Sequence, residues 1–277
     1  MSIRVGEDLV NVSVDFWVDQ YVRILSMSGH SKWSTIKRQK GVTDIKRGQT
    51  FTKIANAITI AVKMGGSGDP ESNPRLKAAL ETARGVNMPK ENVQRAIDRG
   101  LGKGGAETLE EVTYEGFGPG KVAFYVEGLT DNRLRTNQEI KSIFEHSGGR
   151  LGGTGSTGYC FKKIGDIRVQ GKGGSAEEEM LELIDLGAED VEEFIENIQG
   201  YLVYTQSSEL NTMGTKITQA GYRVENQELV MKPTILQEVT VKEIAQKVIE
   251  FIEKLEEQED IQKVYANFEI PEEILPT

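Results

Sequence analysis

Cysteine, histidine and long apolar runs are all scarce in this sequence of 277 residues. The single cysteine, Cys160, cannot form an intrachain disulfide, which fits the reducing interior of a cell. Two histidines, His30 and His146, are too few and too far apart for a zinc site of ordinary spacing. No apolar run approaches the roughly 18 residues that span a bilayer, and no secretory signal opens the chain. These absences predict a cytoplasmic protein without a metal, a cofactor or a membrane segment.

Catalytic patterns are equally scarce. The letters GTGSTG at 153–158 match a dinucleotide-binding fingerprint, but a helix is expected before them and a strand after them, the reverse of what pyrophosphate binding needs. A Cys160–His146 nucleophilic pair is disfavoured because Cys160 lies in an apolar strand pattern. The ten acids of residues 177–196 are read as a solvated helix face rather than a magnesium site. The chain is therefore predicted not to be an enzyme, and a metal-dependent hydrolase is the unlikely enzymatic alternative.

Charge is present in quantity and is unevenly distributed. The net charge is -10, yet residues 27–105 carry fifteen Lys/Arg against six Asp/Glu, giving +9. Residues 106–277 carry sixteen bases against thirty-three acids, giving -17. A polyanion would be attracted to the first segment and repelled by the second. This asymmetry predicts a docking region for nucleic acid near the N-terminus.

The basic segment 29–53 is the centre of that prediction. It places seven bases and two aromatic residues around a single acid, a combination that neutralises phosphates and stacks on bases. A solvated helix face is the alternative for such a charge run. The candidate nucleic-acid-binding residues are His30, Lys32, Trp33, Lys37, Arg38, Lys40, Lys46, Arg47 and Lys53.

Helical spacing dominates the first part of the chain. A helix is expected from Thr43 to about Met64, with an apolar stripe on one side and Lys46 and Lys53 on the other. Asn73 before Pro74 is typical of an N-cap with proline at the first helical position, and Pro89 starts another short helix. We therefore expect a small helical bundle, bounded by the glycine-rich 100–105.

Beyond residue 106 the pattern changes to short strands and helices. Residues 166–232 follow the order β-α-β-β-α-β, which is a complete ferredoxin-like unit, and the flanking pieces look like a second such unit that the first interrupts. The fold class is α+β: an N-terminal helical bundle followed by two ferredoxin-like α/β domains. The predicted parts are an extension (1–26), a basic helical domain (27–105), a ferredoxin-like domain (106–164 with 233–277) and an inserted one (165–232).

Two local patterns carry further expectations. Ser175 with Glu178 predicts a capping box that opens a helix with Leu181 and Ile184 turned inward. The segments TYEGFGPG (113–120) and TDNR (130–133) pair aromatic and polar side chains with a tight turn and a helix start. Turn and capping chemistry is the alternative explanation for both. They suggest a possible inter-domain or partner site at Tyr114, Asp131, Asn132 and Arg133.

Several long motifs, taken in order, resemble the YebC/PmpR family. They are GHSKW at 29–33, FTK at 51–53, NPRLKAALETAR at 73–84, NMPKENVQRAI at 87–97, YEGFGPG at 114–120 and LTDNR at 129–133. The resemblance implies a three-domain cytoplasmic protein that regulates gene expression without being an enzyme. Some members are described as DNA-binding transcriptional regulators, and others as translational activators at the ribosome.

The leading hypothesis is a monomeric nucleic-acid-binding regulator that docks through its helical domain on promoter DNA, ribosomal RNA or the ribosome. No recognition-helix pattern or paired half-site geometry is visible, which slightly favours RNA. A protein-only adaptor that uses the acidic domains for a basic partner is the alternative from another class. No small-molecule substrate is expected. Residues 1–26 are read as an appendage whose deletion leaves folding and binding intact.

Overall fold

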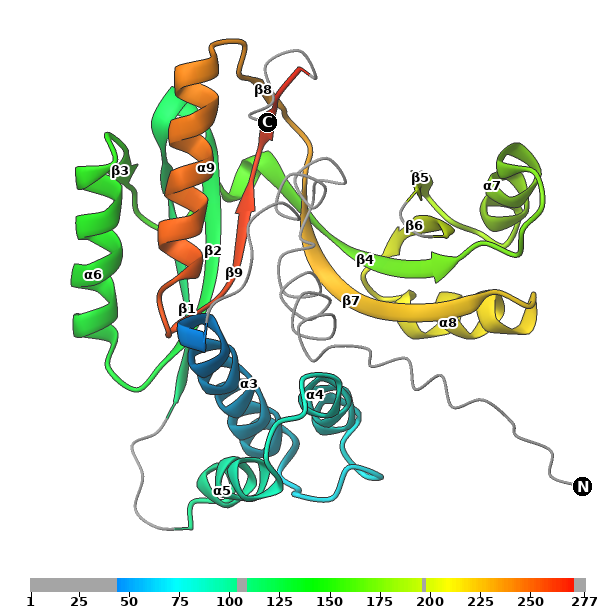
Figure 1. Cartoon of the computed structure of the whole chain (residues 1–277), viewed down its shortest axis with the longest axis horizontal. Helices are drawn as coiled ribbons and strands as arrows, with labels where there is room; N and C mark the ends of the chain where they lie inside the picture. The colour runs from blue at the N-terminus through cyan, green and yellow to red at the C-terminus, as the bar shows by residue number, and fades with distance from the viewer. Residues whose placement is uncertain (1–43, 104–108, 196–197, 272–277) are drawn as a thin grey trace, which may run out of the picture. The chain divides into compact units, whose positions relative to one another are not determined.

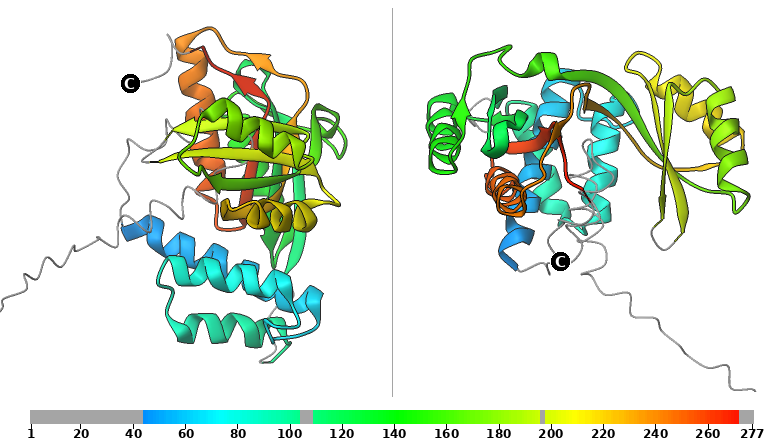
Figure 2. Two further views of the ribbon diagram at one scale, coloured as in Figure 1. Left: turned by 90° about the vertical axis from the view of Figure 1, so that its right-hand side faces the viewer. Right: turned by 90° about the horizontal axis from the view of Figure 1, so that it is seen from above.

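A computed structural model describes residues 44–103, 109–195 and 198–271, with side chains from residue 48 onward. Its described residues fall into two compact units, one helical as far as Leu109 and one of mixed α/β type from Glu110. Figure 1 shows the elements of both units, and Figure 2 gives two further views. No helix within the described ranges is long and apolar enough to cross a membrane.

The helical unit consists of α3 (Asp44–Gly65), α4 (Pro74–Gly85) and α5 (Lys90–Gly100). The expected apolar stripe of α3 is buried, with Ile54, Ile58 and Val62 almost without solvent exposure. The α3 helix packs against both α4 and α5. The predicted helices, including the start near Pro89, are confirmed because their signals are local: helical spacing, caps and proline.

Asn73 joins two helices through one side chain. Its Oδ1 accepts the Leu76 N–H at 3.1 Å, which caps α4 as the Asn-Pro pair predicted. Its Nδ2 donates to Ala61 O at 2.9 Å and to Ser67 O at 3.1 Å, near the end of α3. The amide is buried, and its donors and acceptor all have partners, so the cap also fixes the angle between α3 and α4.

The first sheet of the α/β unit has the strand order β3-β1-β2-β9, and every pairing in it is antiparallel. Two helices, α6 and α9, supply their buried residues to the core on one face of this sheet (Figure 1). Phe124, Phe144 and Phe251 meet edge to face at the centre of that core. The elements are β1 (Glu110–Phe117), the 3-10 turn η1 (Pro119–Lys121), β2 (Ala123–Thr130), α6 (Arg133–His146), β3 (Arg150–Leu151), α9 (Lys242–Glu256) and β9 (Ile261–Ala266).

The second sheet is built from the chain between β3 and α9. Its strand order is β5-β6-β4-β7, all antiparallel, with α7 and α8 packed on one face. A short parallel pair, β8 (Gln237–Glu238) with β10 (Phe268–Glu269), lies outside both sheets. The elements are η2 (Gly158–Cys160), β4 (Phe161–Gln170), α7 (Ala176–Asp185), β5 (Asp190–Ile195), β6 (Gln199–Gln206), α8 (Leu210–Gln219) and β7 (Arg223–Pro233).

The α+β class is confirmed, with two antiparallel sheets that each carry helices on one face. The predicted β-α-β-β-α-β order of residues 166–232 is present as β4-α7-β5-β6-α8-β7. The strand β1 was missed, because its apolar alternation is limited to Val112 and Tyr114, and Glu115 on the other face is buried although it is an acid. The domain limits drawn from the sequence stay a prediction.

The rotation of α7 differs from the expectation. Leu181 and Ile184 are exposed, whereas Glu179 and Leu183 are buried. Ser175 stands at the N-cap position but makes no side-chain capping bond. The carboxylate of Glu179 instead folds back on the preceding loop, accepting the N–H of Lys172 at 3.0 Å and of Gly174 at 2.7 Å. Because this buried carboxylate fixes the helix, the apolar pair predicted to face inward turns outward.

Candidate functional site

Most of the predicted nucleic-acid-binding residues belong to the N-terminal segment. His30, Lys32, Trp33, Lys37, Arg38 and Lys40 lie outside the described residues. Lys46 and Arg47 are in the first turns of α3, where only the backbone is described. The binding role of all eight residues therefore stays a prediction.

Lys53 is the one predicted cation of this set whose side chain is described. The sequence placed it opposite the apolar stripe of α3, but it is only 8 % exposed, and Thr50 and Asn56 on the same helix are buried as well. Lys53 is therefore a buried residue of α3, and its role in nucleic-acid binding stays a prediction. Helical periodicity identifies the apolar side of α3, but it does not reveal that a polar side is also covered.

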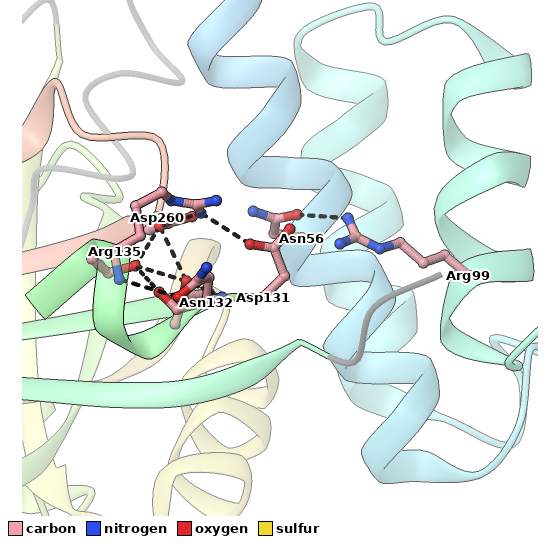
Figure 3. A network of polar contacts seen from close by, with 8 residues as sticks. Asn56, Arg99, Asp131, Asn132, Arg135 and Asp260 are labelled. Carbon is pink, nitrogen blue, oxygen red and sulfur yellow. Dashed lines mark hydrogen bonds and ion pairs between the residues drawn. The ribbon is translucent and has the colours of Figure 1, made fainter. Parts of the chain in front are cut away.

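Other exposed cations of the helical unit were not named from the sequence. Arg84 lies in the last turn of α4 and Lys90 begins α5, on either side of a short turn in which Asn87 has φ 53°. Both side chains are exposed, and neither forms an ion pair with a described residue of the chain. By contrast, Arg99 donates to Asn56 Oδ1 at 3.5 Å (Figure 3). The charge surplus of residues 27–105 is the signal in the sequence that could have identified Arg84 and Lys90 as candidates.

The TDNR segment forms the start of α6, as the alternative explanation of capping chemistry predicts. Asn132 Oδ1 accepts the Arg135 N–H at 3.1 Å, and Thr130 Oγ1 accepts the Asn132 N–H at 2.9 Å. Asp131 pairs with Arg135 at 2.9 Å. Arg133 extends from the same turn, 70 % exposed in its side chain and 4.0 Å from the carboxylate of Glu110.

Asp260 joins this corner from the loop before β9 (Figure 3). Its Oδ2 accepts from Thr136 Oγ1 at 2.6 Å, from Thr130 Oγ1 at 3.1 Å and from Arg135 Nη2 at 2.9 Å. The hydrogen bond to Asp260 is the main cause that raises the pKa of Arg135, so this guanidinium stays charged. The sequence analysis did not identify this hydrogen-bonded group, because Asp260 is more than 120 residues from Arg135 and Thr136 in the sequence.

Tyr114 belongs to the same corner but faces the core. Burial raises the pKa of its phenol, the charge of Arg133 lowers it, and the charge of Asp260 raises it further. Tyr114 is buried and Arg133 is exposed, so the four predicted residues do not form one accessible surface. Their role in a partner site stays a prediction.

The glycine-rich loop that follows β3 does bind an anion, but an internal one. Glu115 of β1 accepts the N–H of Gly155 at 2.8 Å, of Thr157 at 2.8 Å and of Gly158 at 2.6 Å. Burial raises the pKa of this carboxyl, and the three backbone bonds lower it by more, so it stays below its usual range. The dinucleotide reading of GTGSTG is excluded, because the amides already hold Glu115.

A cluster of charged side chains, which no sequence motif indicated, lies on the face of the second sheet that carries no helices. Asp166 of β4 is buried there, opposite Glu228 of β7 in the strand register. Burial, with the nearby charges of Glu228 and Glu192, raises the pKa of Asp166 to about 7, while Lys263 and Lys232 lower it. Lys263 comes from β9 of the first sheet and pairs with Glu228, so the cluster joins the two sheets.

Neither metal nor thiol chemistry finds a site in the part of the chain that is described. No group of three His, Cys, Asp or Glu side chains there is arranged to hold a metal ion. Cys160 is buried in the apolar cluster between the sheets. His146 is exposed at the end of α6, and its Nδ1 lies 2.7 Å from Ser142 O.

Comparison with known proteins places these features in a family. The sequence pattern described as "TACO1/YebC protein N-terminal domain" matches residues 31–103, and that of "TACO1/YebC second and third domain" matches residues 109–268. The chain belongs to the TACO1/YebC family. The two matches include the helical unit, the corner around Asp260 and the loop that holds Glu115.

Relatives in this family have high identity over almost their full length. A "Probable transcriptional regulatory protein" of Chloroflexus aurantiacus is 47 % identical over 251 residues, covering 90 % of this chain and 98 % of the relative. Proteins of the same name from Rubrobacter xylanophilus and Syntrophomonas wolfei are 46 % and 43 % identical, each over 90 % of this chain and 98 % and 99 % of the relative. The crystal structure of a conserved hypothetical protein from Aquifex aeolicus is similar, with 41 % identity, a TM-score of 0.74, and coverage of 84 % of this chain and 95 % of that one.

Proposed function

We propose that this TACO1/YebC chain is a cytoplasmic, monomeric, non-enzymatic regulator of gene expression that binds nucleic acid through its N-terminal helical unit. The observation that carries the proposal is the charge split, +9 for residues 27–105 against -17 for residues 106–277. A polyanion is attracted to the first segment and repelled by the second, so the approach is oriented. The names of the relatives, probable transcriptional regulatory proteins, agree with this class of function.

Within the helical unit, the exposed Arg84 and Lys90 extend the cationic surface beyond the basic segment. Neither is neutralised by a described carboxylate, so both retain a full charge for phosphate oxygens. Lys53 is buried in α3, so its proposed contact with phosphate would require a change in its surroundings. Promoter DNA and ribosomal RNA are both compatible targets. The absence of a recognition-helix pattern in the sequence slightly favours RNA, and the names of the relatives favour DNA.

The test measures binding of the full chain to duplex DNA, to ribosomal RNA and to ribosomes across a range of salt concentrations. Six neutralised phosphates give a log-log salt slope of about -5. A variant with Lys37→Glu, Arg38→Glu and Lys46→Glu should bind weakly while keeping its circular dichroism spectrum. The matched control reverses three exposed lysines of α9, Lys242, Lys247 and Lys254, and should bind almost as the parent does. A flat salt response, or equal loss in both variants, contradicts the proposal.

A further inference from the structure

The outer face of α7 carries an exposed aliphatic pair. Leu181 is 61 % exposed and Ile184 is 46 % exposed, and they lie one helical turn apart. Glu177, Glu178 and Asp185 are exposed on the same side, since at 100° per residue the five residues span about 120° of the helix. The opposite side holds the buried Glu179 and Leu183. We call these five outward residues the α7 face.

The acids of the α7 face differ from their neighbours in having no ion-pair partner among the residues that the structure describes. Residues 177–196 contain ten acids and no base. Six of the nine described acids in this segment are engaged: Glu182 with Lys172, Glu189 with Lys162, Asp190 and Glu192 with Lys232, Glu179 with loop amides, and Glu193 with Gln199. Glu177, Glu178 and Asp185 form no ion pair with any residue that the structure describes. The unneutralised charge therefore coincides with the exposed aliphatic pair.

We propose that the α7 face is a docking surface for a cationic amphipathic helix of a protein partner. Apolar side chains of that helix, spaced three or four residues apart, would pack on Leu181 and Ile184, as in helix recognition generally. Its flanking lysines and arginines would meet Glu177, Glu178 and Asp185. This interaction goes beyond the proposed binding of nucleic acid and does not depend on it.

The negative charge of the α7 face favours a cationic helix over a nucleic acid and over a second copy of the chain. A nucleic acid would bring phosphates toward three unpaired carboxylates and would be repelled. A second copy of the chain, docked through the same face, would place Glu177, Glu178 and Asp185 near their own equivalents, because a two-fold contact uses one patch twice. A cationic helix with an apolar stripe complements both the charge and the aliphatic pair.

The experiment titrates the full chain against a fluorescent synthetic helical peptide with lysines around a leucine stripe, followed by anisotropy. A second peptide of equal charge, with glutamine in place of each leucine, separates charge attraction from apolar docking. The variant Leu181→Ser with Ile184→Ser should weaken binding of the leucine peptide about tenfold and leave the glutamine peptide unchanged. Its control is Leu134→Ser with Ile235→Ser, which removes two exposed aliphatic residues elsewhere and should bind as the parent does.

Charge is tested by neutralising Glu177, Glu178 and Asp185 as amides. This variant should bind both peptides more weakly, and its binding should depend less on salt. The control variant neutralises three other exposed acids, Glu238, Glu243 and Glu259, and should show a smaller effect. Unchanged binding in the serine variant of the α7 face overturns the proposal, as does equal loss in its control. A concentration-dependent dimer in sedimentation, abolished by the same serine variant, would assign the face to a second copy instead. Circular dichroism verifies that each variant is folded.

Discussion

Gly158 donates its backbone N–H to Oε2 of Glu115 at 2.6 Å, in a loop whose letters resemble a phosphate-binding motif. With Gly155 and Thr157, it surrounds a carboxylate that is 5 % exposed. The loop and β1 are thereby held together by an internal anion. The same arrangement recurs at Glu179, which accepts from Lys172 and Gly174 at the start of α7.

Replacing Glu115 by glutamine should destabilise the chain by about 3 kcal/mol at pH 7, because charge-assisted bonds to three backbone donors are weakened. The exposed Glu110→Gln is the control and should cost under about 0.5 kcal/mol. Urea unfolding measures both. The folded pKa of Glu115 is lowered, so its contribution is present above the unfolded pKa and is lost as pH falls through the folded one. Parent and variant should therefore converge in acid; a constant difference would refute this assignment.

Glu179→Ala should destabilise by about 2 kcal/mol, because two loop amides lose their acceptor and a buried space opens. Glu178→Ala, one position earlier on the exposed side of α7, should have almost no effect. Chemical unfolding of the two variants side by side tests whether Glu179 fixes the rotation of the helix. Similar losses in both variants would argue against that role.

Gly100→Ala should loosen the contact between α5 and α3. A Cβ at this position would lie 2.6 Å from Thr59 O and 2.7 Å from Val62 Cβ, and a backbone oxygen cannot easily move away. We expect a loss of about 2 kcal/mol, seen as faster hydrogen exchange in α3 and α5. Gly85→Ala, at the end of α4 with open space around its Cβ, should be neutral or stabilising by about 0.5 kcal/mol. Exchange in α3 that does not change in Gly100→Ala would contradict the packing.

Asp166→Asn should remove one contribution to the pH dependence of stability between pH 4 and pH 7. The folded pKa of about 7 is above the unfolded value of 3.8, so the contribution of Asp166 is present at low pH and is lost as pH rises through 7. The groups that face it are Glu228, Lys232, Glu192 and Lys263, and the Tyr204 phenol. Asparagine has no proton to lose, so the variant should gain stability relative to the parent between pH 5.5 and pH 8, by about 2 kcal/mol. Parallel pH profiles in urea unfolding would show that Asp166 does not titrate there.

Elements with local signals were predictable from the sequence, and the reasons are visible in single residues. Asn73 before Pro74 predicts a helix cap, and in the structure Asn73 Oδ1 accepts the Leu76 N–H at 3.1 Å. The order of strands and helices in 166–232 follows from alternation and turn residues in the same way. These features depend on neighbours within a few positions, so periodicity and capping rules are sufficient.

The features that the sequence did not predict depend on residues that are distant from one another in the sequence. β1 was missed because Glu115 is a buried acid, and nothing local indicates that amides forty residues later will satisfy it. Leu181 and Ile184 were given the wrong orientation because Glu179 occupies the inward position. Asp260 meets Thr136 only after the whole second sheet has intervened. In each case a carboxylate accepts hydrogen bonds from donors that local sequence patterns do not reveal.

The most direct test of the central claim is the salt dependence of nucleic-acid binding by the full chain and by a variant with Lys37→Gln, Arg38→Gln and Lys46→Gln. The log-log slope should fall in magnitude from about 5 to between about 2 and 3, because each neutralised phosphate contact accounts for about 0.9. Neutralising Lys242, Lys247 and Lys254 of α9 should leave the slope unchanged. If the α9 variant changes the slope as much as the N-terminal one, or if neither changes it, the cationic N-terminal region is not where nucleic acid binds.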